Sequence, residues 1–348
     1  MKLIFSPWML CAMTFTIVSA NECGLSTECR PIADCPFIRD NFNLIKRKRY
    51  CNLDRPGAHV CCRKSSQNLT QSKSVDLPIV RECRSYDSLP SLQNPLGEGC
   101  HYKSNIVGRV KAEPKEFPFI VLIYRKDGNM FSQFCVGTLI SKEYVLTSAH
   151  CFLYGTLRPN WVRIGELDYD SETDDASPED IAIKNFIPHH QYYSTGLFRY
   201  NDIGLIQLAK EITFDDYVRP ACLSPADDNH FQQFLFAGWG YRYSVPSSHL
   251  LKVKLDRLAD HRCSEMFSHL LEKGINNRTH TCAIPSTGDF GTCDEAGPLI
   301  VNHPEFPCQY LVVGIMSFGH SVCGTKNDPS VYTRVKPYTD WIQRIVWN

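Results

Sequence analysis

The sequence lacks any long apolar run after its first 20 residues. A membrane-spanning helix needs roughly 18 or more consecutive apolar residues, so we expect no internal membrane span. The chain also has no net charge, because its 37 Lys and Arg residues are balanced by 37 Asp and Glu residues. Without a basic excess, the composition does not predict nucleic-acid binding.

The one apolar run, residues 3–18, follows a single early Lys2 and is followed by Ser19 and Ala20. This pattern is typical of a cleavable secretory signal, so we expect residues 1–20 to be removed after Ala20. A lone membrane anchor is the alternative, but a run of about 16 residues is short for one. Loss of Lys2 leaves 36 basic residues against 37 acidic ones, a net charge of −1.

Cysteine, in contrast, is abundant, with 17 residues in the chain. Since Cys11 would leave with the signal, 16 remain, and an even, high count predicts eight disulfides rather than a metal or redox centre. We therefore expect the protein to be secreted and extracellular. The remaining 328 residues, 348 less 20, exceed one ordinary domain, so two units are expected.

The first unit is predicted over residues 23–62, a span too short to bury a core of its own. It holds six cysteines, at positions 23, 29, 35, 51, 61 and 62. Disulfides must staple it, and six cysteines allow 15 connectivities, among which spacing alone does not choose. Residues 63–82 are rich in Ser, Gln and Lys and predict a mobile linker, the first part of a linker or pro-segment over 63–105.

From residue 106 to 348 the chain consists of short β-branched and aromatic runs broken by Gly, Pro and Asp. Many short strands at near-regular spacing predict an all-β barrel or sandwich. Strands are expected at 119–124, 137–140, 144–147, 161–164, 203–208, 235–237 and 311–317. One helix is predicted, over 339–347, where Trp341, Ile342, Ile345 and Val346 share a face that would pack on the barrel.

Four motifs occur in order in this region: L-T-S-A-H-C at 146–151, N-D-I-G-L at 201–205, G-W-G at 238–240 and V-Y-T-R-V at 331–335. Together they resemble the landmarks of the chymotrypsin-like serine proteases. The resemblance implies two six-stranded antiparallel β-barrels with a C-terminal helix and a site between the barrels. The cysteines of 23–62, ending in adjacent Cys61 and Cys62, resemble the clip domain of arthropod clip-domain proteases. The C-R-S-Y segment at 83–86 and the C-Q-Y segment at 308–310 resemble the snake and persephone subgroup of that family.

Within this resemblance His150 matches the general base and Asp202 the residue that orients it. The family's nucleophile segment reads C-x-G-D-S-G-G-P-L, whereas residues 293–299 read C-D-E-A-G-P-L. Aligned on Gly297, Glu295 stands in place of the serine and Ala296 in place of a glycine. Aligned on the cysteine, the segment is two residues short and lacks the glycine of the oxyanion hole. We predict a protein that has lost serine-protease catalysis.

The specificity pocket and the activation site also depart from the family pattern. Gly291 stands where an Asp would select basic side chains, and Ser330 replaces a glycine and should crowd the pocket wall. Ser317 and Gly319 keep the strand that pairs with a bound peptide, so peptide docking by strand addition stays open.

Activation in the family requires cleavage after a basic residue. Here Asn105 precedes Ile106, whose new amino terminus would pair with Asp294. A trypsin-like activator would not favour Asn105, so cleavage at this position is not predicted.

The resemblance further implies disulfide pairings. For the clip domain they are Cys23–Cys61, Cys29–Cys51 and Cys35–Cys62; for the protease-like domain they are Cys135–Cys151, Cys263–Cys282, Cys293–Cys323 and Cys100–Cys222. Analogy with the snake and persephone subgroup alone pairs Cys83 with Cys308.

Two further features concern the surface. Asn68 and Asn277 each begin an N-x-T glycosylation acceptor. The acidic loop from Glu166 to Asp180 offers hard oxygen ligands for calcium, as in some relatives. Because its carboxylates follow no fixed ligand spacing, a solvated acidic loop is the favoured interpretation, and no cofactor is expected.

Three functions remain open. The favoured one is a secreted pseudoprotease that acts as cofactor, adaptor or decoy in an extracellular proteolytic cascade, with other secreted proteases or zymogens as partners. The resemblance points to insect haemolymph immunity, in melanisation or Toll-type signalling. The alternatives are an active trypsin-like endopeptidase with an unusual nucleophile such as Glu295, and a structural or adhesive matrix protein.

Overall fold

The computed structural model divides the chain into two compact units, Met1–Ser72 and Lys73–Asn348. It describes residues 27–31, 59–63, 77–87, 89, 108–128, 130–153, 157–195, 198–242, 245–268, 274–286, 296–306, 309–319 and 328–347. No helix among them is long and apolar enough to cross a membrane. In the first unit, strands β1 (Thr27–Pro31) and β2 (His59–Arg63) pair antiparallel. The clip-domain disulfide predictions fall outside the described side chains.

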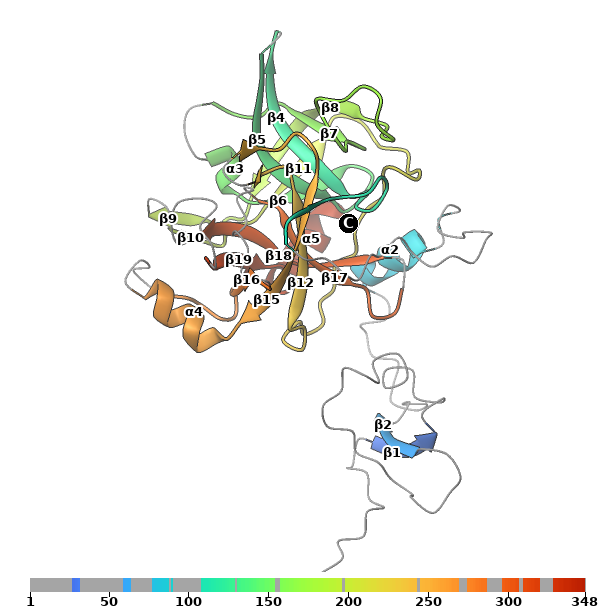
Figure 1. Ribbon diagram of the computed structural model, residues 1–348, viewed down its shortest axis with the longest axis vertical. Helices are drawn as coiled ribbons and strands as arrows, with labels where there is room; N and C mark the ends of the chain where they lie inside the picture. Colours follow the sequence, from blue (N-terminus) through green and yellow to red (C-terminus); the bar gives the residue numbers. More distant parts are fainter. Residues whose placement is uncertain are drawn as a thin grey trace, which may run out of the picture. The chain divides into compact units, whose positions relative to one another are not determined.

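The second unit contains a first closed barrel of six strands, in the order β11-β6-β5-β4-β7-β8 (Figure 1). All of its strand pairs are antiparallel. The strands are β4 (Ile120–Asp127), β5 (Met130–Leu139), β6 (Tyr144–Thr147), β7 (Trp161–Ile164), β8 (Glu179–Pro188) and β11 (Gly204–Leu208).

The second barrel also has six strands, in the order β12-β17-β18-β19-β16-β15, and the β12–β15 pairing closes it. Strand β3 (Val110–Lys111) pairs with the first two residues of β15, ahead of the residues of β15 that pair with β16. The barrel strands are β12 (Gln233–Gly238), β15 (Leu251–Leu258), β16 (His280–Pro285), β17 (Pro298–Asn302), β18 (Tyr310–Gly319) and β19 (Ser330–Arg334). The predicted fold of two six-stranded antiparallel barrels is confirmed.

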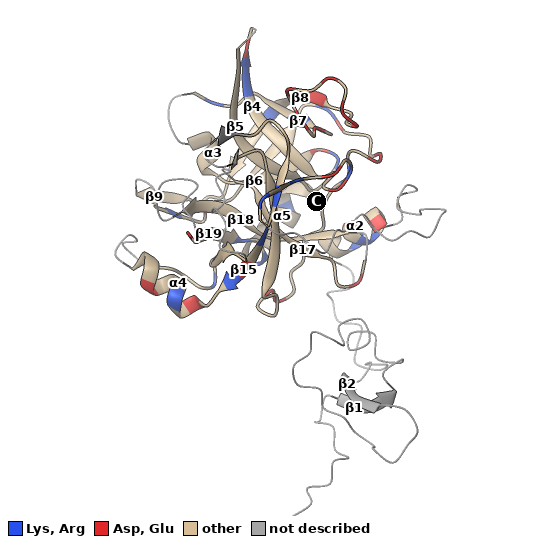
Figure 2. Cartoon of the chain, in the orientation of Figure 1, with Lys and Arg blue, Asp and Glu red and all other residues tan. Residues whose placement is uncertain are grey.

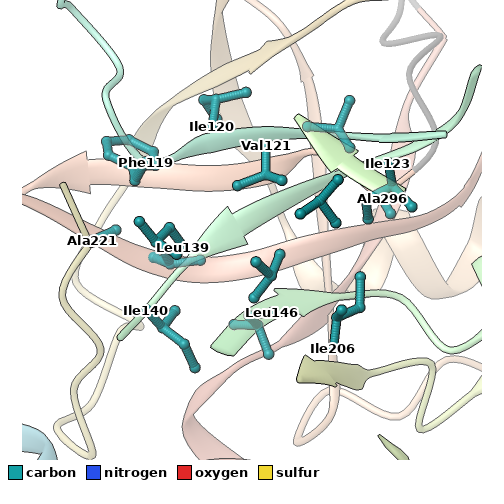
Figure 3. Close-up of a cluster of buried hydrophobic side chains, with 14 of the residues drawn as sticks. Phe119, Ile120, Val121, Ile123, Leu139, Ile140, Leu146, Ile206, Ala221 and Ala296 are labelled. Atoms are coloured by element: carbon teal, nitrogen blue, oxygen red, sulfur yellow. The ribbon is translucent and has the colours of Figure 1, made fainter. Parts of the chain in front are cut away.

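The barrels form because their strands carry apolar side chains that face inward. In β7 burial alternates along Trp161–Ile164, as expected for a strand with one wet face, whereas the first five residues of β4 are all buried. Figure 3 shows aliphatic side chains of β4, β5 and β6 packed together with Ala296, which belongs to the same core cluster. Burial of this apolar surface is the main driving force for the fold.

Helix α5 (Thr339–Val346) confirms the predicted C-terminal helix, with Ile342 fully buried. The shorter elements are α3 (His150–Leu153), α4 (Asp260–Phe267), the 3-10 helix η4 (Lys336–Tyr338), and the two-stranded pairs β9 (Tyr193–Thr195) with β10 (Phe198–Tyr200) and β13 (Tyr241–Arg242) with β14 (Val245–Pro246).

Helix α2 (Pro78–Asp87) corrects the prediction of a mobile linker at the end of 63–82. Its buried residues Ile79, Cys83 and Tyr86 follow helical spacing, and a proline fits its first position. The backbone N–H of Ile79 donates to Gln343 of α5 at 3.3 Å, and the Tyr86 hydroxyl donates to the Ile140 carbonyl at 2.9 Å. The segment is therefore docked on the protease-like unit.

The disulfides of this unit partly match the predictions. Cys135–Cys151 and Cys263–Cys282 are confirmed. Cys83 bonds to Cys222, with Cα atoms 5.0 Å apart, so the predicted pairs Cys83–Cys308 and Cys100–Cys222 are wrong. The reason is that α2, docked by its own apolar face, carries Cys83 directly to Cys222. Cys100, Cys308 and the predicted Cys293–Cys323 pair lie outside the described residues.

Candidate functional site

His150 begins α3, just after β6. The disulfide of the next residue, Cys151, ties α3 to Cys135 in β5. The hydroxyl of Ser148 donates to the Met316 carbonyl in β18 at 2.7 Å, which links this turn to the second barrel. The histidine is therefore fixed where the two barrels meet.

Asp202 lies fully buried between β10 and β11 and faces the histidine. Its carboxylate accepts the His150 backbone N–H at 2.9 Å and the Ser317 hydroxyl at 2.5 Å, and it lies 2.8 Å from His150 Nδ1. The preceding Asn201 has a φ of 52°, a left-handed conformation held by the Tyr338 hydroxyl, which donates to Asn201 Oδ1 at 2.8 Å. The structure thus brings His150 and Asp202 together, at a distance that suits a base and the residue that orients it.

The electrostatics of the pair favour an ionised carboxylate. Burial acts to raise the pKa of Asp202, but the charge and hydrogen bond of His150, with contributions from Arg199 and Ser317, outweigh it and hold the pKa below its ordinary value. An ionised carboxylate only accepts, so Nδ1 carries the proton and Nε2 is left as the basic nitrogen. This arrangement can orient a base.

The nucleophile side is described from Ala296 onward. A side chain at Gly297 would place its Cβ 2.3 Å from Phe236 Cζ, and the Gly297 carbonyl accepts the Met316 N–H at 2.9 Å. Ala296 is fully buried with a φ of 67°, where alanine is strained. The turn into β17 is thus fixed in register. The predicted site residues Gly291, Asp294 and Glu295 lie outside the described residues, as do Asn105 and Ile106.

Two serine hydroxyl groups described beside the pair already donate to acceptors other than the histidine. Ser148 donates to Met316, and Ser317 donates to Asp202 rather than to the histidine. Their geometry therefore holds the pair in place and does not present a hydroxyl to His150 Nε2 as a nucleophile would require.

Three of the four residues predicted to form the specificity pocket, Ser317, Gly319 and Ser330, are among the described residues. Gly319 of β18 lies directly opposite Ser330 of β19, and the Ser330 hydroxyl is 3.9 Å from where a Cβ on Gly319 would stand. Ser317 and Ser330 are both buried. Gly319 and Ser330 are thus cross-strand neighbours at ordinary contact distance, and the crowding of the pocket wall by Ser330 stays a prediction.

The acidic loop between β7 and β8 is visible in Figure 2, and it forms ion pairs with Lys and Arg side chains of the same chain. Arg163 donates to Asp180 at 2.6 Å and lies 3.3 Å from Glu166, and Asp175 lies 3.6 Å from Lys115. Burial raises the pKa of Glu166, although Leu167 N–H and Arg163 oppose it. The guanidinium of Arg163 thus supplies positive charge to both ends of the loop where calcium was considered.

Two groups of described residues bring three potential metal ligands within 4.8 Å of one another: Cys83, Cys222 and His303, and Cys135, His150 and Cys151. In each group the two cysteines form a disulfide, which removes the thiolates that would bind a metal. Of the glycosylation acceptors, Asn277 is exposed in a turn and Asn68 lies outside the described residues.

Sequence reasoning missed Arg199 and His280, which surround the pair. Arg199 is buried and its Nη1 donates to the Ser317 carbonyl. His280 is fully buried, and burial lowers its pKa to about 4. Neither stands in a recognisable motif, and only the long-range packing of β10 and β16 against β18 reveals them.

Comparison with known proteins gives extensive matches. The family model for trypsin matches residues 106–342. The chain is 30% identical over 356 residues to serine protease ea of Drosophila melanogaster, covering 91% of this chain and 88% of that one. It is 31% identical over 370 residues to melanization protease 1 of the same species (95% and 90% covered). It is 30% identical to CLIP domain-containing serine protease HP8 of Bombyx mori (98% of both).

Proposed function

We propose that this chain, which belongs to the clip-domain serine proteases of the trypsin family, is a secreted homologue without proteolytic activity that serves as a cofactor, adaptor or decoy in an extracellular proteolytic cascade. The observation that carries the proposal is the residue at the nucleophile position. In this sequence that residue is Glu295, and no serine is found between Cys293 and Gly297.

The packing of Gly297 supports this alignment. Because a Cβ at this position would collide with Phe236, the residue before Pro298 has to be glycine. The turn is also tied to β18 through Met316. An alignment anchored on this glycine therefore has a physical basis, and it puts Glu295 where the family has serine and the two missing residues upstream of it.

The magnitudes favour an inactive protein. In subtilisin, loss of the nucleophile costs about 2 × 10⁶ in turnover, and what remains comes from the oxyanion hole and substrate binding. Here the two missing residues include the glycine that would donate to the oxyanion. A glutamate would also add negative charge where an anion must develop. The His150–Asp202 pair then has no nucleophile to activate.

The proposed cascade role rests on the relatives. One of them is named a melanization protease, and the chain aligns with it over nearly its whole length. An extracellular setting agrees with the disulfides of the protease-like unit, which form in oxidising compartments. We infer action in insect haemolymph, in melanisation or Toll-type signalling, with secreted proteases or their zymogens as partners.

The variant Glu295→Ser tests the inactive state. Opened by designed cleavage before Ile106, it should hydrolyse chromogenic peptides no faster than Glu295→Ala, because the two residues that shape the oxyanion loop are still missing. Substantial hydrolysis by Glu295→Ser alone would contradict the alignment and the proposal.

The cascade role needs a separate experiment. After immune challenge, the native protein should be recovered from cell-free haemolymph in complex with secreted proteases. Retention in cuticle or matrix, with none in the fluid, would contradict the role and favour a structural protein.

A further inference from the structure

Beside the His150–Asp202 pair, the described strands leave one edge of β18 unpaired, which we call the open edge. On one side β19 pairs with it as far as Gly319. On the other side β17 pairs only up to Ile315, and the last contact is the Met316 N–H to the Gly297 carbonyl. Among the described strands, none continues the ladder beside residues 317–319 on this side. Such an edge normally accepts an extended peptide through main-chain hydrogen bonds.

In this protein the β9–β10 hairpin lies against that edge. Phe198 of β10 packs edge-to-face on Phe318, with ring centroids 5.7 Å apart. The next residue, Arg199, is 8% exposed, and its Nη1 donates to the carbonyl oxygen of Ser317. The acceptor that begins the open edge is therefore already used by a side chain of the same protein.

The guanidinium also interacts with two other polar groups. It lies close enough to Asp202 to help lower the pKa of that carboxyl, and it interacts with the Tyr192 hydroxyl. A hydrogen bond from a charged donor is roughly twice as strong as a neutral one, and a buried guanidinium without its acceptor would carry the full desolvation cost. A peptide main chain offers only a neutral N–H in exchange.

We infer that Arg199 is a built-in block on the β18 edge, which excludes the main chain of an extended peptide from Ser317. This goes beyond the proposed loss of catalysis, because it concerns binding: the protein is closed to substrate-like peptides even as passive ligands. Strand addition, which the sequence left open, is thereby prevented by a residue outside the strand.

The test compares peptide affinity with and without the guanidinium. The probes are fluorescein-labelled hexapeptides Ala-Ala-Pro-X-Ala-Ala, with Ala, Leu, Phe or Lys as X, titrated by fluorescence anisotropy into the full-length protein. Arg199→Met removes all donors but keeps an unbranched side chain that fills space, and Arg199→Ala removes the side chain altogether. We expect at least one probe to bind both variants about tenfold or more tightly than wild type, the factor for one net hydrogen bond.

Arg257→Met is the matched control, because Arg257 is another largely buried arginine of the second unit, paired with Asp228 away from this edge. It should bind the probes as weakly as wild type. Hydrogen exchange adds the location: in Arg199→Met, saturating peptide should slow exchange of the amides of residues 317–319. If Arg199→Ala does not fold, Arg199→Met carries the test.

Equal affinities of wild type and Arg199→Met for every probe would overturn the block, as would tighter binding without protection of residues 317–319. The inactive state is judged separately, by mass spectrometry of the same samples. Cleaved probe would contradict the proposed function, whereas the ratio of affinities alone decides the role of Arg199.

Discussion

The His150–Asp202 pair and the turn at Ala296–Gly297 form two sides of one site, and they differ in how closely their residues match the family pattern. Besides contacting the histidine ring, the Asp202 carboxylate accepts hydrogen bonds from two buried donors, the His150 backbone N–H and the Ser317 hydroxyl. Gly297 is required by Phe236. Residues with a structural task thus match the family pattern, whereas the proposed alignment places Glu295 at the nucleophile position, whose task in the family is chemical. An intact pair of this kind is therefore no evidence of catalysis.

The strongest challenge to this comparison is Asp202→Ala. It removes the acceptor of the His150 N–H and the Ser317 hydroxyl in a fully buried place, and we expect a loss of about 3–5 kcal/mol in the free energy of unfolding. Denaturant unfolding measures it. Asp127→Ala is the control, since its pairing with Arg125 is exposed and worth about 1 kcal/mol or less. Similar losses for both would mean that the pair has no structural task.

The next largest effect is expected from acid, which should lower the free energy of unfolding through the buried His280. The pKa of His280 falls from 6.5 to about 4 on folding because burial disfavours its charged form. Its contribution is complete above pH 6.5 and is lost as the pH falls toward 4, where unfolding lets the ring take up a proton; the loss is roughly 3 kcal/mol.

Unfolding curves at pH 7 and pH 4.5 measure this loss. His280→Phe should reduce the pH dependence by about that amount, while His189 and His303, whose pKa burial also lowers to about 4, keep the remainder. His261→Asn, at an exposed position of α4, is the control and should keep the full pH dependence. A wild-type stability that does not change between these pH values would contradict a buried neutral His280.

On the other side of the site, Gly297→Ala should cost about 2–3 kcal/mol, because the new methyl group overlaps Phe236 and the core has to shift. Gly274→Ala is the matched control: its φ is 66° and no atom lies within 4 Å of the added Cβ, so only backbone strain of about 1 kcal/mol applies. Thermal unfolding compares the two. Equal losses would show that Phe236 does not fix the register of the turn.

The smallest effect is expected for Ala296→Gly. Relief of the left-handed conformation gains about 1–2 kcal/mol, while the freer unfolded chain and one lost buried methyl group cost about as much. We expect stability within about 1 kcal/mol of wild type by the same measurement. A large gain would mean that strain at Ala296 is a main cost of the altered turn.

Much of the barrel fold follows from local pattern. The strands expected at 144–147 and 161–164 coincide with β6 and β7, because apolar runs of that length are bounded by turn residues. Strand β15 was missed although its sequence, L-K-V-K-L-D-R-L, alternates as a strand should. Helix α2 was missed for a different reason: its three buried residues stand among polar ones, and only α5 and the barrel explain them.

The site was predictable as far as it rests on motifs. His150 and Asp202 were found because each stands in a recognisable segment, and the structure joins them at 2.8 Å. The partner of Cys83 and the contact of Arg199 with Ser317 were not found, because each depends on residues more than 100 positions apart in the chain. Spacing carries no signal for such pairs.

Covalent labelling with a serine-directed reagent tests the proposed loss of catalysis most directly. The recombinant protein, intact and cleaved by design before Ile106, is treated with a serine-directed fluorophosphonate and analysed by intact-mass and peptide mass spectrometry, with trypsin as a positive control. We expect no adduct on any residue in either form. An adduct at a single residue, lost on denaturation before treatment, would contradict the proposed loss of catalysis.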